Sequence, residues 1–332
     1  MNILDNLKLK IFDINAHSLR GLNFYKSIVD YRKEIIPKHK HRIKQDKDFI
    51  CTLCGNNQGN KFLKWEEVGY TLFRCCSCDA VSPNIDVNID DYTSSIYDID
   101  EYVDKFIRET HNQYEYRKNK FGKERYGYTV DRLNIGVDSR VLDIGCGAGY
   151  YLDVLKDNLI ECKGLEVSNH LVEYCKSYHN LNVENTSLEG EPDGHYDLIT
   201  MFDVLEHLSD PVSVFNMINK KLKPGGYCVA YTPNIFSVGY ELMGVKQNTL
   251  LPFEHLCFFN NRSLEFLVKK TGFKIEVLET YGLDIMDYLL LKEYEDGINY
   301  TDNLQDLMNL LQAVLDNNKI SNHFRITFKK ED

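Results

Sequence analysis

Short apolar runs that alternate with helical patterns constrain the fold of this chain more than any other feature. From Ser139 onward, RVLDIG, CKGLEVS, YDLITMF and GYCVAYT have the character of buried strands, and amphipathic helical periods lie between them. This alternation is typical of βαβ units, in which parallel strands form a sheet with helices on both faces. The sequence therefore predicts an α/β, Rossmann-like fold that continues through a helical insertion at 283–320 to a last strand, HFRITFKK.

Three smaller segments are expected before this domain. The N-terminal segment has Leu4, Leu7, Ile11 and Ile14 at helical spacing and is followed by a basic stretch over 32–47. We interpret the basic stretch as a solvated face, with an anionic partner as the alternative. The predicted parts are a helical N-terminal segment (1–48), a zinc ribbon (49–82), a linker with lid helices (83–130) and the α/β domain (131–332).

The zinc ribbon is predicted from the spacing of its cysteines. Cys51-x-x-Cys54 is followed after 20 residues by Cys75-Cys76-x-Cys78. Two such pairs give Zn²⁺ the four thiolates that it prefers, and four protein ligands leave no open position for catalysis. We therefore expect a structural zinc held by Cys51, Cys54, Cys75 and Cys78, with Cys76 as the spare thiol that could exchange with Cys75. Free or redox-active thiols are the alternative.

Charge and hydropathy exclude some classes of protein. The 332 residues include 50 acidic and 39 basic side chains, a net charge of −11. Nonspecific binding to nucleic acid needs many Lys and Arg side chains, so a nucleic-acid partner is not expected. No apolar stretch approaches the roughly 18 residues of a membrane helix, and the N-terminus does not resemble a signal peptide. We expect a cytoplasmic protein without a membrane span, and the sequence does not indicate its oligomeric state.

A glycine-rich turn follows the first strand of the α/β domain. The loop GCGAG at 145–149 lets a ligand approach the backbone, and Glu166 ends the next strand, where a carboxylate can bind both ribose hydroxyls. A dinucleotide fingerprint would need a third glycine where Tyr150 stands. Asp143 would repel a pyrophosphate but attract the sulfonium and ammonium groups of S-adenosylmethionine. The loop therefore favours S-adenosylmethionine over a dinucleotide.

Several motifs in order resemble those of class I S-adenosylmethionine-dependent methyltransferases. They are VLDIGCGAGYYL, GLEVS, YDLITMFDVLEHLSDP and LKPGGYCVAYTPN, and the resemblance covers about 139–280. It implies a seven-stranded sheet with an antiparallel last strand. It also implies a binding site for S-adenosylmethionine made by Asp143, Gly145, Cys146, Gly147 and Gly149 around the methionine part, Glu166 at the ribose, and Met201 and Phe202 beside the adenine and sulfonium.

Two segments are candidates for the chemistry of the methyl acceptor. If Asp203-Val-Leu-Glu206-His207 is helical, its three polar side chains share one face. The segment resembles the acidic-histidine segment of quinone O-methyltransferases, which implies a divalent metal at Asp203, Glu206 and His207. The second candidate, Glu254-His255, lies in a loop over 233–260 that is long enough to be a binding lid.

The Glu254-His255 segment resembles the catalytic segment of sugar C-methyltransferases, which also carry a cysteine-zinc module. This resemblance, together with the lid position, predicts His255 as the general base, assisted by Glu254 and His207. The chain ends after one last strand, without the second C-terminal domain of those enzymes, so oxygen methylation is favoured over carbon methylation.

The predicted function is that of bacterial sugar and small-molecule methyltransferases. We expect O-methylation of a nucleotide-linked or glycan-linked sugar, or of a related small metabolite. The alternatives are a sugar C-methyltransferase, an RNA methyltransferase that uses the zinc ribbon to bind its substrate, and a noncatalytic scaffold.

Overall fold

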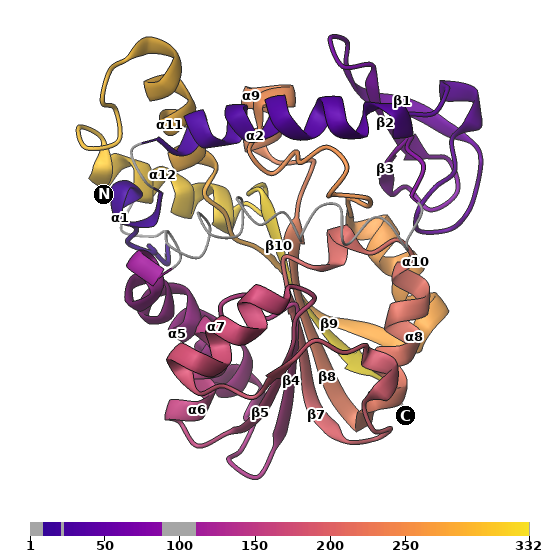
Figure 1. The fold of residues 1–332 in the computed structure, drawn as a ribbon, viewed down its shortest axis with the longest axis vertical. Helices are drawn as coiled ribbons and strands as arrows, with labels where there is room; N and C mark the ends of the chain where they lie inside the picture. The colour runs from indigo at the N-terminus through magenta and orange to yellow at the C-terminus, as the bar shows by residue number, and fades with distance from the viewer. Residues whose placement is uncertain (1–8, 21–22, 88–110, 332) are drawn as a thin grey trace, which may run out of the picture.

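A seven-stranded sheet forms the centre of the part of the chain that the computed structural model describes, residues 9–20, 23–87 and 111–331 (Figure 1). Five strands pair in parallel, and the last strand of the chain lies antiparallel between two neighbours. The predicted α/β class and the antiparallel last strand are confirmed. In spatial order the strands are β6 (Val183–Glu184), β5 (Glu161–Leu165), β4 (Arg140–Ile144), β7 (Tyr196–Phe202), β8 (Leu222–Pro233), β10 (His323–Lys330) and β9 (Phe273–Thr280).

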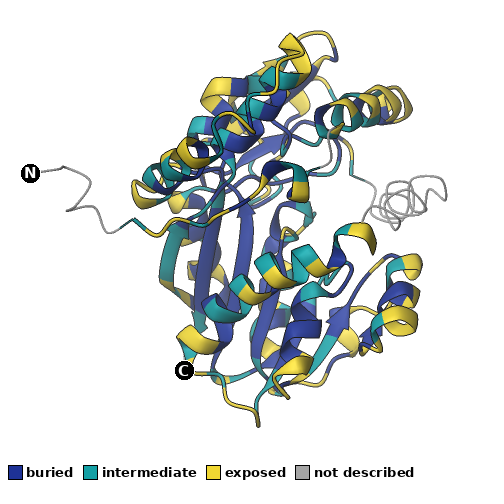
Figure 2. Cartoon of the chain, turned by 90° about the vertical axis from the view of Figure 1, so that its left-hand side faces the viewer, coloured by how far each residue is buried: buried dark blue, intermediate teal, exposed yellow. Residues whose placement is uncertain are grey.

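Helices cover both faces of this sheet, and each face has its own apolar core. On one face, Phe215 and Leu264 of two helices pack with Ile199 of β7, and on the other face Leu152 packs with Val141 of β4. Figure 2 shows the strands buried and the outer faces of the helices exposed. The covering helices are α6 (Tyr150–Asp157), α7 (Asn169–His179), α8 (Pro211–Lys221) and α10 (Asn261–Thr271).

A helical run over 111–133 precedes β4 and packs with α6. It holds α5 (Lys123–Tyr126) between two π-helical turns, Lys118–Gly122 and Gly127–Asp131. This run includes the end of the predicted linker and lid helices (83–130), of which residues 83–87 and 111–130 are described and residues 88–110 lie outside the described residues. Gly122 allows close contact, because a Cβ there would lie 2.8 Å from the carbonyl oxygen of Tyr150.

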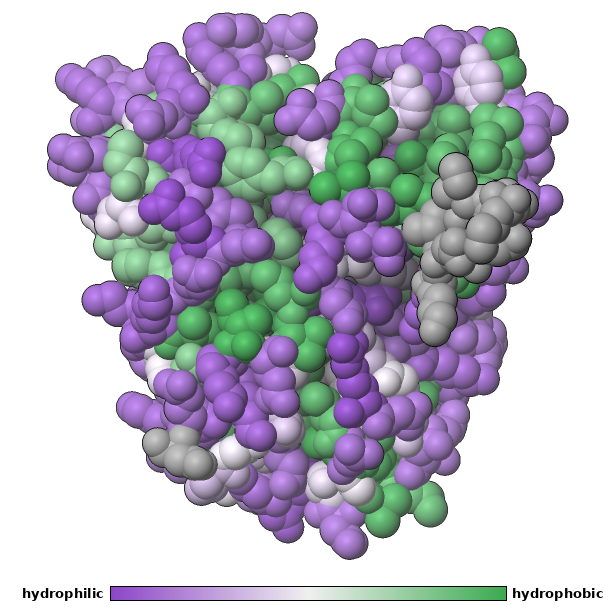
Figure 3. Space-filling model, turned by 180° about the vertical axis from the view of Figure 1, so that it is seen from behind, coloured by the Kyte–Doolittle hydropathy of each residue, from purple (hydrophilic) through white to green (hydrophobic). Residues whose placement is uncertain are grey.

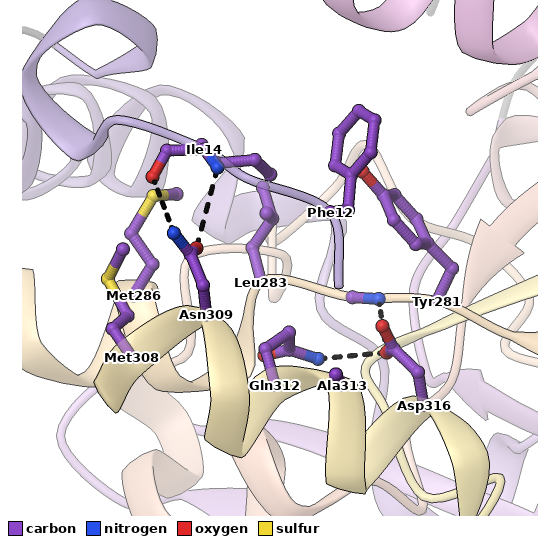
Figure 4. Close-up of a pocket in the computed structure, with 11 residues that line it drawn as sticks. Phe12, Ile14, Tyr281, Leu283, Met286, Met308, Asn309, Gln312, Ala313 and Asp316 are labelled. Atoms are coloured by element: carbon purple, nitrogen blue, oxygen red, sulfur yellow. Dashed lines mark hydrogen bonds between the residues drawn. The ribbon is translucent and has the colours of Figure 1, made fainter. Parts of the chain in front are cut away.

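Among the described residues of the predicted helical segment over 1–48, the first helix begins at Ala16, which corrects the prediction for residues 9–15. Asn15 caps α1 (Ala16–Leu19), and α2 (Phe24–His39) follows, while residues 9–15 are not helical. The Ile14 N–H instead donates a hydrogen bond to the side-chain oxygen of Asn309 on α12 (Gln305–Asn317), and the side-chain nitrogen of Asn309 donates one to the Ile14 carbonyl oxygen (Figure 4). Contacts with α12 therefore replace the hydrogen bonds of a helix, and Leu4 and Leu7 lie outside the described residues.

The helical insertion predicted over 283–320 is present as α11 (Asp284–Asp296) and α12. With the N-terminal segment it encloses a cavity of about 10 Å³, lined partly by Phe12, Met286 and Met308 (Figure 4). Such a volume holds about one water molecule. This cavity is therefore too small to bind a cofactor or an acceptor.

The cysteine-bearing segment folds as a small antiparallel sheet of β1 (Gly59–Trp65), β2 (Tyr70–Cys75) and β3 (Val81–Pro83). We call residues 49–83 the cysteine module. It lies beyond the carboxyl ends of the parallel strands, next to α2 (Figure 1). Val81 and Phe258 exchange backbone hydrogen bonds of 3.0 and 2.8 Å, and the Asn260 amide donates to the carbonyl and carboxylate of Asp79. The module is thus joined directly to the α/β domain.

The connection over 233–260 is packed, although the sequence predicts a structureless lid. It contains α9 (Val238–Met243) and a 3₁₀ turn, Gly244–Lys246. Phe253, Leu256 and Phe258 are at most 1% exposed and share an apolar core with Tyr70 of the cysteine module. The prediction is wrong because these apolar side chains are buried by a module that is distant in the sequence.

Seen from behind, apolar surface occurs in patches among hydrophilic side chains (Figure 3). In the described ranges, every helix is either too short or too polar to cross a bilayer.

One arginine of the basic stretch over 32–47 is buried, whereas Lys33, Lys38, Lys40 and Lys47 are exposed. Arg32 is 8% exposed, and its guanidinium donates to the carbonyl oxygens of Gln247 and Leu250 at 2.6 and 2.8 Å. Lys38 pairs with Glu34, and Lys44 pairs with Asp86. The buried arginine fixes α2 to the packed connection, so its role is structural.

Replacing Arg32 should therefore destabilise the protein. Arg32→Ala leaves two buried carbonyl oxygens unpaired, and we expect the free energy of unfolding to fall by about 2–3 kcal/mol. Urea denaturation followed by circular dichroism measures this change. Lys33→Ala, at an exposed position of the same helix, is the matched control and should leave stability nearly unchanged. Equal stability of both variants would contradict the structural role of Arg32.

Candidate functional site

The turn after β4 has the shape that a ligand-binding loop requires. Gly145, Gly147 and Gly149 have φ values of 65°, 54° and 80°, which residues with side chains rarely adopt. A Cβ at Gly145 would lie 2.4 Å from Val204, and one at Gly149 would lie 2.5 Å from Leu181. A Cβ at Gly147 would meet no protein atom within 4 Å. Gly147 therefore faces open space, which fits a cofactor that approaches the backbone.

Glu166, predicted to bind the ribose, lies against this loop. One carboxylate oxygen accepts from the Gly147 N–H at 2.8 Å, and the other accepts from the Ser168 N–H at 3.0 Å. Burial raises the pKa of Glu166, and the backbone hydrogen bonds act in the opposite direction. The glycine loop and its acidic partner therefore meet, as the sequence predicts.

Asp143 lies below the same loop. Its side chain is buried, and it accepts a hydrogen bond of 2.6 Å from the Thr200 hydroxyl. Burial raises the pKa of Asp143 to about 7. A neighbouring cation would favour the ionised carboxylate and lower this pKa again. Cys146, within the loop itself, is half-buried, and its sulfur lies 4.0 Å from the Gly147 carbonyl oxygen.

Met201 and Phe202 end β7, and their side chains belong to the cores of opposite faces of the sheet. Met201 is fully buried. Phe202 lies on the face of the helical run 111–133, where the guanidinium of Arg125 is 4.3 Å from the centre of its ring. Of the two residues predicted to border the adenine and sulfonium, Phe202 is the one on the side of α5 and α6.

Four cysteines of the cysteine module converge as predicted. The sulfur atoms of Cys51, Cys54, Cys75 and Cys78 all lie within 4.8 Å of one another. The Cys51–Cys78 and Cys54–Cys75 sulfur distances are 3.5 Å. Four sulfurs about 2.3 Å from one zinc ion would have a similar spacing, so the set fits tetrahedral zinc. Cys76 is exposed and is not part of the cluster, which makes Cys75 the fourth candidate ligand.

A second cluster joins two segments that sequence reasoning treated separately. Glu206, His207 and His255 each offer one ligand atom, and these atoms lie within 4.8 Å of one another. The Nε2 atoms of both histidines lie 3.8 Å from Glu206 Oε1, while the Thr232 hydroxyl donates to Glu206 Oε2 at 3.0 Å. One carboxylate and two imidazoles could hold a divalent cation such as zinc.

Burial determines the protonation of this cluster. It raises the pKa of Glu206 well above its usual range and lowers the pKa of His207 to about 4. Burial and the nearby His207 ring keep the pKa of His255 well below its usual range. Both imidazoles are therefore neutral at pH 7, as is required of a proton acceptor or a metal ligand.

Asp203 lies apart from this cluster, because the segment after β7 is not an α-helix. Asp203 has a φ of 61°, and only a 3₁₀ turn, Leu205–His207, follows. Its carboxylate oxygens lie 3.4 Å from Arg125 and 3.5 Å from His323 Nε2. The metal set predicted as Asp203, Glu206 and His207 is therefore not assembled, and His255 takes the place of Asp203. No motif in the sequence singled out Arg125 or His323.

Glu254 contacts a different part of the molecule from its neighbour His255. Its carboxylate accepts a hydrogen bond from the Tyr31 hydroxyl on α2, and burial raises its pKa to about 7. Its catalytic role stays a prediction, and the observed contact is one between the packed connection and α2.

A larger hollow, with a volume of about 530 Å³, lies between the cysteine module and helices α8 and α10. Its lining includes Ile50, Cys54, Val212 and Phe266, but none of the loop glycines or of the Glu206 cluster. The hollow is therefore distinct from the candidate site.

Comparison with known proteins places this geometry in a family. The family described as "Methyltransferase domain" matches residues 105–278. A ubiquinone biosynthesis O-methyltransferase of Nitrosospira multiformis is 30% identical over 118 residues, which are 33% of this chain and 49% of that protein. A probable S-adenosylmethionine-dependent methyltransferase of Mycolicibacterium smegmatis is 30% identical over 148 residues, 43% of this chain and 54% of that protein. The chain thus spans about half the length of these curated relatives.

A solved structure, a SAM dependent methyltransferase from Archaeoglobus fulgidus, has 24% sequence identity and a TM-score of 0.43 over 62% of this chain and 94% of that chain. The family match covers more than half of the chain and includes the glycine loop, Glu166 and the Glu206 cluster. This chain therefore belongs to the methyltransferase-domain family.

Proposed function

We propose that this enzyme transfers a methyl group from S-adenosylmethionine to a hydroxyl oxygen of a small molecule. The observation that carries the proposal is the cluster of neutral His207 and His255 around Glu206, at the end of the strand that follows the donor-binding strands. A hydroxyl is a poor nucleophile, so its methylation benefits from a group that removes its proton. The relatives named O-methyltransferases support oxygen as the acceptor atom.

On the donor side, residues of this chain bind S-adenosylmethionine and orient it. S-adenosylmethionine supplies an electrophilic methyl group on its sulfonium. Gly147 gives the backbone room to approach the donor, Glu166 binds the ribose, and Asp143 attracts the positive charge. Alignment of the acceptor oxygen with the methyl carbon is then the main requirement for the displacement.

On the acceptor side, His207 receives the proton. Its side chain is 23% exposed, compared with 5% for His255, so an acceptor can reach His207 more directly. His255 and Glu206 hold His207 in position from the buried side. This arrangement moves the predicted role of general base from His255 to His207. Alternatively, the same three residues could hold a divalent cation. His207 would then be a metal ligand and not the proton acceptor, and the cation would supply a Lewis acid for the acceptor hydroxyl.

The cysteine module holds a structural zinc in this proposal. Its four sulfur atoms satisfy tetrahedral zinc, and its strands pack on the connection that carries His255. The ion would therefore support the acceptor side without touching it.

Other acceptors receive less support. The relatives named above are not described as acting on sugars, so a sugar acceptor and carbohydrate modification stay predictions. An RNA acceptor is disfavoured by the net charge of −11. The cytoplasmic location also stays a prediction.

Gly147→Arg should abolish binding of S-adenosylmethionine, because the new side chain would fill the open space above the loop. Isothermal titration calorimetry measures the affinity. Gly194→Arg is the matched control, since Gly194 also has a positive φ, 61°, and open surroundings, but lies outside the loop. Normal binding by the Gly147 variant would remove the loop from the donor site.

Affinity for S-adenosylmethionine should rise with pH because of Asp143. Its pKa of about 7 means that the carboxyl is mostly protonated at pH 6 and mostly ionised at pH 8. The ionised form attracts the sulfonium, so we expect roughly tenfold tighter binding at pH 8 than at pH 6. Asp143→Asn should bind weakly with little pH dependence. The same pH profile in both proteins would show that Asp143 does not titrate on binding.

The purified protein should contain one zinc ion per chain at the cysteines, measured by plasma mass spectrometry. The double variant Cys51→Ser, Cys54→Ser should lose this zinc and unfold at a lower temperature, because metal binding stabilises small cysteine modules. Cys76→Ser, at the exposed thiol outside the cluster, should keep it. A second metal ion per chain that disappears in His255→Ala would assign a cation to the Glu206 cluster.

The proposed function is tested with methyl-labelled S-adenosylmethionine and a cell extract. Label should enter small molecules with wild-type enzyme, and His207→Ala should lower the rate ~10²-fold or more while donor affinity holds. His41→Ala, at an exposed histidine, is the control. Label in RNA would favour the RNA alternative, and a near-normal rate in His207→Ala would exclude that residue as the base.

A further inference from the structure

Two arginines beside the acceptor side have guanidinium groups that are incompletely paired. The Nη2 atom of Arg125 on α5 lies 3.4 Å from Oδ2 of Asp203. The Nη2 atom of Arg20, which follows α1, lies 4.0 Å from Oδ1 of Asp287. Both distances exceed the 2.7–2.9 Å or so of a strong charged hydrogen bond. The Nε atom of each is buried and has no hydrogen-bond partner among the described residues.

Other arginines of this chain pair much more closely. Arg74 donates to both oxygens of Asp79 at 2.6 and 2.7 Å, and Arg132 donates to both oxygens of Glu279 at 3.1 and 2.8 Å. Arg325, also at the acceptor side, forms a buried pair of 2.8 Å with Glu124. Arg20 and Arg125 are therefore distinguished by the length of their ion pairs, while an unpartnered buried Nε is a feature that they share with Arg325.

Both guanidinium groups are nevertheless held in place. Arg20 stacks on the ring of Phe24 at 4.2 Å, and Arg125 stacks on the ring of Phe202 at 4.3 Å. Their side chains are 24% and 19% exposed, so part of each remains accessible to a ligand. Stacking on an aromatic ring positions a guanidinium and leaves the N–H groups at its edge available. Both guanidinium groups are thus fixed in position with N–H donors that could bind an anion.

The position of Arg125 links these donors to the methyl-transfer site. Phe202, on which Arg125 stacks, is followed by Asp203 and by Val204, which approaches Gly145 of the donor loop. Arg125 also lies between two π-helical turns, which are uncommon and frequent at functional sites. Contacts at the start of β10 connect the two arginines. The Asn322 amide donates to Asp287, the partner of Arg20, and the next residue, His323, has its Nε2 atom 3.5 Å from Asp203, the partner of Arg125.

We propose that the methyl acceptor carries an anionic group, a carboxylate or a phosphate, and that Arg20 and Arg125 bind its oxygens. This inference rests on the proposed function and names the chemical class of its acceptor. Two guanidiniums match one small anionic group, since planar N–H pairs fit the oxygens of carboxylate and phosphate. The long contacts of Arg125 with Asp203 and of Arg20 with Asp287 can be exchanged for closer contacts with the acceptor's anionic group.

The test uses simple anions as probes of the full-length, zinc-loaded protein in complex with S-adenosylhomocysteine. Line broadening in NMR measures the binding of inorganic phosphate and, separately, of ¹³C-acetate. Wild-type protein should bind the anion that matches its acceptor, and Arg20→Gln and Arg125→Gln should each weaken that binding about tenfold or more. Arg132→Gln, which breaks a surface pair with Glu279, should bind as wild type does.

Binding of phosphate alone would assign a phosphate-bearing acceptor, and binding of acetate alone would assign a carboxylate. The proposal is overturned if neither anion binds, or if the variants at Arg20 and Arg125 bind like wild type. Arg125→Lys keeps the charge but loses the planar fork, so it should bind with intermediate affinity and controls for folding. Calorimetry of S-adenosylhomocysteine in each variant separates the two proposals, since loss of anion binding with normal donor binding leaves the methyltransferase function intact.

Discussion

The packing of the connection over 233–260 is the constraint on which the acceptor side depends. The Glu206 carbonyl accepts hydrogen bonds from the backbone N–H groups of Leu256 and Cys257, at 2.7 and 3.1 Å. On its other side, Phe258 pairs with Val81 of the cysteine module. The connection is therefore fixed between a turn of the α/β domain and a separate small sheet. His255 reaches Glu206 only because both of these contacts are made.

This arrangement explains why a metal-binding module can matter to chemistry in which it takes no part. The sulfur cluster holds the strands of the cysteine module together, and β3 then holds the connection. Arg32 and Tyr31 fix the same connection from α2. A small sheet of three strands has little core of its own, so a zinc ion would supply much of its stability. The position of His255 would then depend on an ion bound elsewhere in the molecule.

The features that the sequence predicts well are those set by local pattern. The βαβ alternation predicts the parallel sheet with helices on both faces, the cysteine spacing predicts which four sulfurs converge, and the GCGAG loop indicates where the backbone is open to a ligand. Each of these requires only residues that are close in sequence, or a fold in which strand order is strongly restricted. The sequence also predicts that Glu166 lies near the loop, because this residue ends the neighbouring strand.

The features that the sequence does not predict are contacts between distant segments. His255 joins Glu206 across about 50 residues, and the pairing of Asp203 with Arg125 and His323 depends on three separate elements. The helical interpretation of the segment after β7 failed because Asp203 adopts a positive φ, which spacing alone does not reveal. The exposed lid was predicted from loop length, but the burial of Phe253 and Phe258 depends on the cysteine module.

Charge movement in the proposed reaction gives the Glu206 cluster a further role. The sulfonium loses its positive charge when the methyl leaves, and the hydroxyl proton carries that charge to His207. An imidazolium in a buried site is unfavourable unless a negative group is near. Glu206 Oε1 lies 3.8 Å from the nitrogen that would be protonated, and Thr232 holds its other oxygen. An ionised Glu206 carboxylate at this distance would compensate the charge of the imidazolium as it forms, with no further proton transfer.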